Sequence, residues 1–359
     1  MTPRLSLAVL GAGLLAWLGA AISCQAATTL HDGGVRPIPG INLTSGAFAP
    51  EGTRREFDYT YPTTGDIDYF TSKGFKILRI SVLAKRLVQP DGAGGFEPAD
   101  DMAIVANLID YAAIKDASVL LDIHDYGRSI SGKLIGRDTG ATEEFAASWR
   151  AIAKALARRP NVIFGLMNEP HDQTAVEWLE GANAAAEAIR GEGAYQLILV
   201  PGSYWDSAWL WTTTDNKAVM LDFDDPAKNF AIEVHQYLDP DGSGTHPEVV
   251  PDSGINRLTA FTTWAREHGV RAFLGEFGWA ATKPALKEGR DMLCLMSRNE
   301  DVWLGWAYFA AGPWWGDYMF SVQPEQGVDK PQMAVLQQFM QAKPPPDCAP
   351  EDRILEDRS

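Results

Sequence analysis

The chain has 359 residues, of which 46% are hydrophobic and 22% are charged, and this composition argues against extensive disorder and against several membrane spans. Asp and Glu number 47 against 31 Lys and Arg, which gives a formal net charge of −16. Such an acidic chain is unsuited to a polyanionic partner such as nucleic acid or an anionic membrane surface. The length suits either one large α/β barrel or two smaller domains.

The N-terminus has the pattern of a secretion signal. Arg4 precedes an almost unbroken apolar run, residues 5–22, and small residues follow it. We predict cleavage after Ala26, so that residues 1–26 are removed and the protein is secreted or periplasmic. A retained membrane anchor is one alternative, and a lipid anchor at Cys24 is the other.

Short apolar runs rich in β-branched and aromatic residues recur along the rest of the chain, with amphipathic helical patterns between them. The eight runs begin at Gly40, Phe75, Ser118, Asn161, Gln196, Asn229, Arg271 and Val302. Alternating strands and helices predict a parallel sheet covered by helices, and eight units close a barrel. We therefore predict a single (β/α)8 TIM barrel, residues 27–342. An open doubly wound sheet is the alternative, but no glycine-rich fingerprint follows the first strand.

Two of the intervening helices have clear signals. After Gly140, one helical face carries Phe145, Trp149, Ile152 and Leu156. The next helix should begin near Thr174, because Thr174 and Glu177 have the spacing of a capping box, and it should end at Gly191.

The C-terminal segment, residues 343–359, is proline-rich and charged, so we expect it to lie on the surface. Once the signal is removed, Cys294 and Cys348 are the two remaining cysteines. A disulfide between them would tie this tail to the body of the protein. The other interpretation is that Cys294, within the apolar run MLCLM, is a buried free thiol.

Polar side chains occur at the ends of nearly all the predicted strands. In a (β/α)8 barrel these ends meet at one rim, where the active site lies. A single buried polar group is commonly a satisfied core residue, but so many at one rim would cost several kcal/mol of desolvation unless they bonded to one another or to a ligand. The residues at these ends are Arg79, His124, Asn168, Glu169, His235, Tyr237, Glu276 and Phe309.

Glu169 and Glu276 are the most informative of these residues. Cleavage of a glycosidic bond needs a pair of carboxyl groups, one to protonate the leaving oxygen and one to attack or to activate water. The motifs HExxH, CxxC, GxSxG and the P-loop are absent. Only His124 and His235 of the six histidines lie at strand ends, so a metallohydrolase is poorly supported and we expect no metal and no cofactor.

The ordered motifs ILRIS, LDIHDYGR, GLMNEP, EVHQY and LGEFG and the loop YFAAGPWWGDYMF resemble the cellulases of glycoside hydrolase family 5. The resemblance extends from about Gly40 to Met340. It implies a retaining (β/α)8 glycosidase in which Glu169 is the general acid/base and Glu276 the nucleophile. The two carboxyl groups would then lie roughly 5 to 5.5 Å apart.

The resemblance also implies contacts for the catalytic pair. Arg79 should lie beside Glu276 and keep it ionised, and Tyr237 should donate to the same carboxylate. Glu169 must hold a proton before cleavage, and His235 is placed to adjust it.

Other residues should contact the sugar. Asn168 matches the residue that binds the 2-hydroxyl, and His124 should contact a neighbouring hydroxyl or order the arginine. Trp205, Trp314 and Trp315 lie in loops after the fifth and eighth predicted strands, and they are candidates for stacking on flanking glucosyl units.

Two residues depart from the family pattern. The last strand usually delivers a tryptophan platform, but Phe309 stands at that position and Trp306 does not match it by register. We expect a weaker platform there, because a phenyl ring has less area and no N–H group. The usual asparagine after the third-strand histidine is Asp125 here, which adds a carboxylate near the cleft.

The expected activity is that of a secreted endo-β-1,4-glucanase, which would cut soluble or amorphous β-glucan in an open cleft. We expect no obligatory protein partner. A β-mannanase or another β-1,4-glycanase is the alternative within the class, because the catalytic set is shared. A non-catalytic carbohydrate-binding barrel is the alternative outside it, but the retained catalytic residues argue against it.

Overall fold

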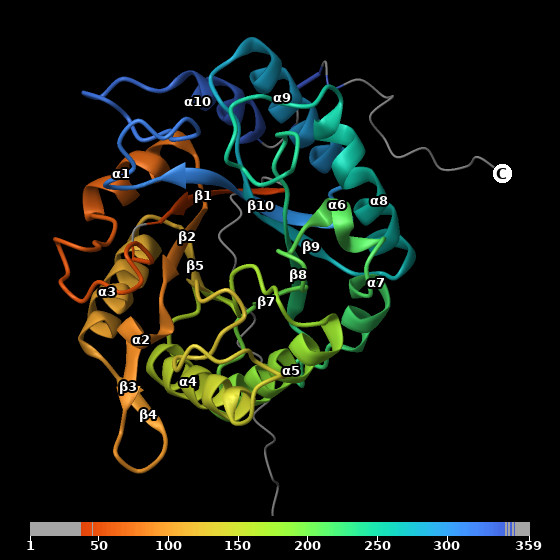
Figure 1. Cartoon of the computed structure of the whole chain (residues 1–359). Helices are drawn as coiled ribbons and strands as arrows, with labels where there is room; N and C mark the ends of the chain where they lie inside the picture. The colour runs from red at the N-terminus through yellow and green to blue at the C-terminus, as the bar shows by residue number, and fades with distance from the viewer. Residues whose placement is uncertain (1–36, 45, 342, 344, 347, 349–359) are drawn as a thin grey trace, which may run out of the picture.

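The computed structural model describes residues 37–44, 46–341, 343, 345, 346 and 348. Eight parallel strands close a barrel in the order β1-β10-β9-β8-β7-β6-β5-β2 (Figure 1). The strands are β1 Ile38–Leu43, β2 Ile77–Val82, β5 Ser118–Ile123, β6 Val162–Gly165, β7 Ile198–Pro201, β8 Phe230–His235, β9 Ala272–Phe277 and β10 Trp303–Ala311. Each strand overlaps one of the eight apolar runs, so the predicted (β/α)8 barrel is confirmed and the open sheet is wrong.

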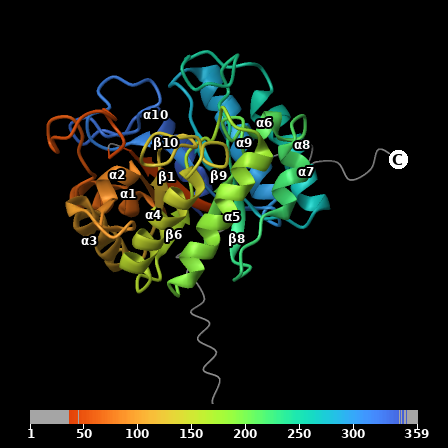
Figure 2. The ribbon, with the colours of Figure 1, turned by 60° about the horizontal axis from the view of Figure 1, so that its bottom comes forward.

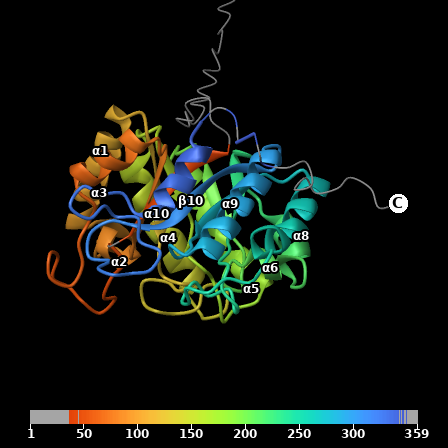
Figure 3. The ribbon, with the colours of Figure 1, turned by 90° about the horizontal axis from the view of Figure 1, so that it is seen from above.

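Helices surround the strands in all three ribbon views (Figures 1, 2 and 3). The longer ones are α1 Thr64–Lys73, α3 Asp100–Ile114, α4 Ala141–Leu156, α5 Ala175–Gly191, α8 Ser253–Glu267 and α9 Lys283–Arg298. The short ones are α2 Ala84–Leu87, α6 Ala208–Trp211, α7 Asn216–Val219 and α10 Pro331–Leu336, with 3₁₀ turns at Met220–Asp222 and Gln337–Phe339.

Both helices with clear sequence signals are confirmed. Helix α4 begins after Gly140 and buries the four apolar side chains of the predicted face. Helix α5 begins after Thr174, whose hydroxyl accepts a hydrogen bond from the Glu177 backbone N–H, while the Glu177 side chain accepts one from the Thr174 backbone N–H. This capping box satisfies two backbone donors that no intrahelical bond can reach.

The barrel interior has an apolar layer and a polar layer. Because side chains alternate along a strand, Ala231, Glu233 and His235 of β8 share one face. Ala231 belongs to a buried apolar cluster to which the other seven segments of the barrel also contribute. Its other members are Ile38, Ile77, Leu120, Ile163, Leu197, Leu199, Phe273, Leu304 and Ala307. Glu233 and His235 follow Ala231 on the same face of β8 and belong to the polar layer. This layer lies closer to the carboxyl ends of the strands, where the connecting loops begin.

A short hairpin outside the barrel was not predicted. Its strands are β3 Val88–Pro90 and β4 Phe96–Pro98, and they pair antiparallel. The sequence GAGG forms the turn between them, with Gly92 and Gly94 at positive φ. Three-residue strands are too short to show a clear alternation of polar and apolar residues, so the sequence carried little signal for them.

The C-terminal tail is tied to the barrel by a disulfide between Cys294 of α9 and Cys348. The predicted bridge is therefore confirmed, and the interpretation of Cys294 as a free thiol is wrong. The predicted signal, residues 1–26, lies outside the described residues, as does most of the tail, so these boundaries stay predictions. Within the described part of the chain, no helix has both the length and the apolar composition needed to cross a membrane.

Candidate active site

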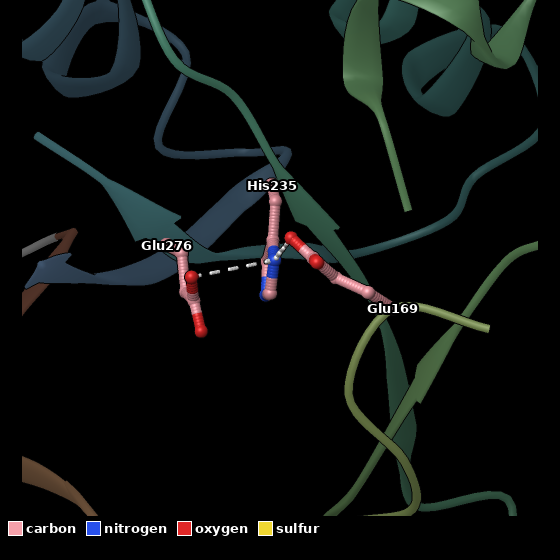
Figure 4. A group of neighbouring side chains, drawn as sticks. All are labelled: Glu169, His235 and Glu276. Atoms are coloured by element: carbon pink, nitrogen blue, oxygen red, sulfur yellow. Dashed lines mark hydrogen bonds and ion pairs between the residues drawn. The ribbon is translucent and has the colours of Figure 1, made fainter. Parts of the chain in front are cut away.

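The two predicted catalytic carboxylates meet at the carboxyl ends of the strands. Glu169 follows β6, and Glu276 lies near the end of β9. One oxygen of each lies within 4.8 Å of the other and of a ring nitrogen of His235, which stands between them in Figure 4. Both carboxylates line one cavity of about 620 Å³. The expectation that they face a single pocket is confirmed.

Glu276 is held by two hydrogen-bond donors. Arg79 donates from Nη1 to Oε1 at 2.6 Å, and the Tyr237 hydroxyl donates to Oε2 at 2.8 Å, as expected. Burial alone would lower the pKa of Arg79, but Asp122, Glu276 and Glu233 raise it above its usual value. Burial and the Glu276 charge raise the pKa of Tyr237 well above its usual value. The nucleophile candidate therefore faces a permanent cation and a hydroxyl that keeps its proton.

Glu169 is held by His235, whose Nδ1 lies 2.8 Å from Oε1. Burial alone would lower the pKa of His235, but Glu276, Glu169 and Glu233 together raise it well above its usual value. The raised pKa favours the charged imidazole, whose Nδ1–H can donate to Glu169. Glu169 itself has φ +42°, a left-handed conformation that is uncommon for a residue other than glycine and is often found at functional sites.

Asn168 and His124 are joined to this network through Arg79 and Asp122. Arg79 Nη2 donates to Asn168 Oδ1 at 2.9 Å, which leaves the amide NH₂ of Asn168 as its other polar group. His124 does not touch the arginine directly: its Nδ1 lies 2.7 Å from Asp122 Oδ2, and Asp122 Oδ1 lies 3.1 Å from Arg79 Nη2. Of the two expected roles for His124, ordering the arginine is thus possible only through Asp122.

Two further cavities adjoin the cavity at the carboxylates, and both border Glu169. One extension of about 810 Å³ is lined by Phe48, Phe309 and Trp315, and another of about 520 Å³ is lined by Trp209 and Leu210. Trp205 lines both extensions and is 51% exposed. Its ring stacks on His171 with the centroids 3.5 Å apart, so it offers its other face to the cleft.

The aromatic residues near the end of β10 have different positions. Phe309 lines the cavity at the carboxylates and packs edge-on against Trp315, with the ring centroids 5.2 Å apart. Trp306 is 1% exposed in the core, in agreement with the mismatch in register. Trp314 is 48% exposed and lines none of these cavities, so the structure does not bring this predicted sugar contact into the cleft. Its backbone has φ +74°, and the following residue, Trp315, lines two of the cavities instead.

Two groups of described residues bring three potential metal ligands together. One is Glu169, His235 and Glu276, whose histidine donates to Glu169 and so uses its nearest nitrogen in a hydrogen bond. The other is Asp239, Asp241 and His246. The Asp239 carboxylate already accepts backbone N–H groups of the same loop, which explains its position without a cation.

Three buried carboxylates of the site were not predicted: Asp122, Asp206 and Glu233. Asp122 and Glu233 lie two residues before His124 and His235, and the alternation of a strand could have placed them inside the barrel. Asp206 lies in the loop after β7, where the sequence carries no such signal.

Asp125 is the second departure from the family pattern, and its carboxylate accepts a hydrogen bond from the Ala84 backbone N–H at 2.8 Å. Burial raises the pKa of Asp125 to about 6, above the value of about 3.9 for an unfolded chain. The folded protein therefore binds more protons than the unfolded one between about pH 4 and pH 6, and stability falls as the pH rises through this window.

We predict that Asp125→Asn raises the free energy of unfolding at pH 8 by about 1 to 3 kcal/mol, because the amide oxygen can accept the same bond without a buried charge. Urea denaturation of both proteins at pH 4 and pH 8 measures the effect. The difference should be small at pH 4 and largest at pH 8. An equal difference at both values would show that the charge of Asp125 is not its cause.

Known proteins resemble this chain over most of its length. The family described as Cellulase (glycosyl hydrolase family 5) matches residues 42–312. Endo-beta-1,4-glucanase A of Emericella nidulans is 37% identical over 275 residues, which are 76% of this chain and 81% of that protein. The structure of XacCel5A in complex with cellopentaose is 38% identical, with a TM-score of 0.80, and the match covers 85% of this chain and 99% of that one. The endo-beta-1,4-glucanase Xac0029 of Xanthomonas axonopodis pv. citri is 37% identical, with a TM-score of 0.80 over 84% of this chain and 98% of that one.

Proposed function

The chain belongs to the cellulase family, glycosyl hydrolase family 5, and from this membership we propose that it is a secreted endo-β-1,4-glucanase that cuts internal bonds of β-glucan with retention of configuration. It is a glycoside hydrolase. Membership of the family shows the class of enzyme, whereas the substrate, the mechanism and the location of the protein are proposed here.

The observation that carries the mechanism is the separation of the two carboxylates. Their nearest oxygens lie within 4.8 Å. Retaining glycosidases hold the pair about 5 to 5.5 Å apart, whereas inverting enzymes hold it about 6.5 to 9.5 Å apart to leave room for a water molecule. The short separation supports direct attack by one carboxylate.

The environments of the two residues support different roles. Glu276, beside Arg79 and Tyr237, is the ionised group that attacks the anomeric carbon, while Glu169 gives its proton to the leaving oxygen. In the second step Glu169 takes a proton from water, the water oxygen attacks the anomeric carbon, and the bond to Glu276 breaks. Asn168, held by Arg79, is placed to bind the sugar 2-hydroxyl.

The extent of the cleft and its aromatic lining favour a polymeric substrate. Two further cavities adjoin the one at the carboxylates and share Glu169 with it, so there is room for sugar units beyond the one at the cleavage site. Trp205 offers an exposed aromatic face for stacking. Two similar proteins are named endo-beta-1,4-glucanases, and a similar structure holds cellopentaose. A β-mannanase or another β-1,4-glycanase remains the second candidate, because these enzymes share the catalytic pair.

Secretion is supported by two features of the chain. The apolar run at residues 5–22 has the pattern of a signal peptide. The disulfide between Cys294 and Cys348 fits a protein that matures in an oxidising compartment. We expect cleavage after Ala26, and acylation of Cys24 is the less favoured alternative.

A panel of polysaccharides tests the proposed function. The purified protein should release reducing sugar from carboxymethyl-cellulose and barley β-glucan, and it should lower the viscosity of the former early in the reaction, as internal cuts do. Proton NMR of a cello-oligosaccharide digest should show the β-anomer first. Activity on mannan or xylan alone would contradict the substrate, and the α-anomer appearing first would contradict retention.

A further inference from the structure

A buried carboxylate, Glu233, lies deeper in the barrel than the catalytic pair. It is on β8, two residues before His235, and its side chain is 1% exposed. Its Oε1 lies 3.3 Å from Arg79 Nε and 3.8 Å from His235 Nε2. A single carboxylate oxygen therefore lies near both cations of the site.

The same two cations contact the catalytic carboxylates with their other nitrogens. Arg79 Nη1 donates to Glu276 at 2.6 Å, and His235 Nδ1 donates to Glu169 at 2.8 Å. The order of contacts is thus Glu276, Arg79, Glu233, His235 and Glu169, with Glu233 in the middle. A shift of Glu233 would change the position of both hydrogen bonds to the catalytic pair.

The neighbouring strand leaves space for this carboxylate. Gly275 of β9 has no side chain, and a Cβ added there would lie 2.1 Å from Glu233 Oε1 and 2.8 Å from its carboxyl carbon. Glycine in a strand interior weakens the strand and often marks a close approach of another group. The close approach here is that of Glu233, so the strand gives up a side chain to accommodate it.

Four carboxylates face His235: Glu233 from its own strand β8, Glu276 from β9, and Glu169 and Asp206 from the loops after β6 and β7. Glu169 and Glu276 lie 2.8 and 3.8 Å from Nδ1, whereas Glu233 and Asp206 lie 3.8 and 3.9 Å from Nε2. Burial raises the pKa of Asp206 well above its usual value, which favours its neutral form. Of the two carboxylates on the Nε2 side, Glu233 is the one that also contacts Arg79, with Oε1 3.3 Å from Nε.

From this geometry we propose that Glu233 is a positioning residue, which holds Arg79 against the nucleophile and keeps His235 a doubly protonated donor to the acid/base. The proposal rests on the function proposed above. Glu233 does not reach the sugar, because it is buried behind the two cations it holds. It acts by fixing the donors that the catalytic carboxylates need at each step.

The variant Glu233→Gln tests the proposal, because it removes the charge and keeps the shape. We expect kcat to fall about 10- to 100-fold with little change in KM, as for a misplaced catalytic group. The alkaline limb of the pH–rate profile should move to lower pH, because His235 loses its proton more easily without a nearby negative charge. Glu288→Gln is the matched control: Glu288 is also buried, at 4% exposure, but on α9, where it accepts the Gly254 N–H.

A measurement without substrate keeps the proposal testable if the variant does not fold. In the full chain labelled with ¹⁵N-histidine, both ring nitrogens of His235 should carry protons at pH 7.5, and in Glu233→Gln this signal should titrate at lower pH. A single protonated nitrogen in the wild type at pH 7.5 would overturn the proposal, and so would a folded Glu233→Gln with the kinetics and pH profile of Glu288→Gln. If the substrate panel instead shows another glycan, the function assigned above fails while this spectrum still decides the role of Glu233.

Discussion

Replacing Glu276 by glutamine should lower kcat on carboxymethyl-cellulose about 10³- to 10⁵-fold, which is the larger of the two strongest effects we predict. An amide cannot form the covalent bond to the anomeric carbon. Tyr237 can still donate to the amide oxygen, and Arg79 keeps Asp122 and Glu233 as partners. We therefore expect the melting temperature to fall by only a few degrees.

Chemical rescue makes this prediction specific for a nucleophile. In Glu276→Ala the side chain is shortened, and azide can occupy the space and attack from the same face. The product should be the α-glycosyl azide, with inverted configuration, whereas the wild type gives the β-sugar. The control Glu288→Gln should keep wild-type activity. Comparable rates for Glu276→Gln and the control would remove Glu276 from its role.

Replacing Glu169 by glutamine should lower kcat on carboxymethyl-cellulose about 10²- to 10⁴-fold, the contribution expected from a general acid/base. The glucosyl leaving oxygen needs a proton, and the amide has none to give. The size of the loss should depend on the leaving group, which distinguishes an acid from a residue that only binds substrate.

A cellobioside of 2,4-dinitrophenol measures this dependence. Dinitrophenolate leaves without protonation, so the first step should remain fast in Glu169→Gln, and the second step should be slow because water lacks its base. A burst of dinitrophenolate followed by slow turnover is the expected result. Azide should speed the turnover and give the β-glycosyl azide. Equal losses on both substrates without a burst would assign Glu169 to binding instead.

The sequence predicts the barrel well because its parallel strands are buried on both sides. Such strands appear as continuous apolar runs, and the eight runs correspond to the eight strands. The catalytic rim is predicted for a related reason, since Glu169, His235 and Glu276 each lie at the end of such a run. Local sequence carries this information, so no long-range contact had to be inferred.

The remaining parts of the site depend on contacts between distant segments. Strand alternation directs Glu233 inward, but its contact with Arg79 exists only because β2 and β8 face each other across the closed barrel. The stack of His171 on Trp205 joins two loops, and loop geometry has no periodic signal in the sequence. Trp314 is exposed and Trp315 lines the cavities, and the positive φ of Trp314 is a backbone feature that their identical side chains cannot reveal.

The apolar layer of the barrel has a consequence for how a polymer is handled. Ala231, Phe273, Leu304 and their neighbours fill the interior next to the polar layer, so the barrel is a closed floor and not a tunnel. A cellulose chain cannot thread through it and has to lie across the mouth. No free chain end is then required for entry, and both fragments can depart sideways after each cut instead of sliding forward to the next bond.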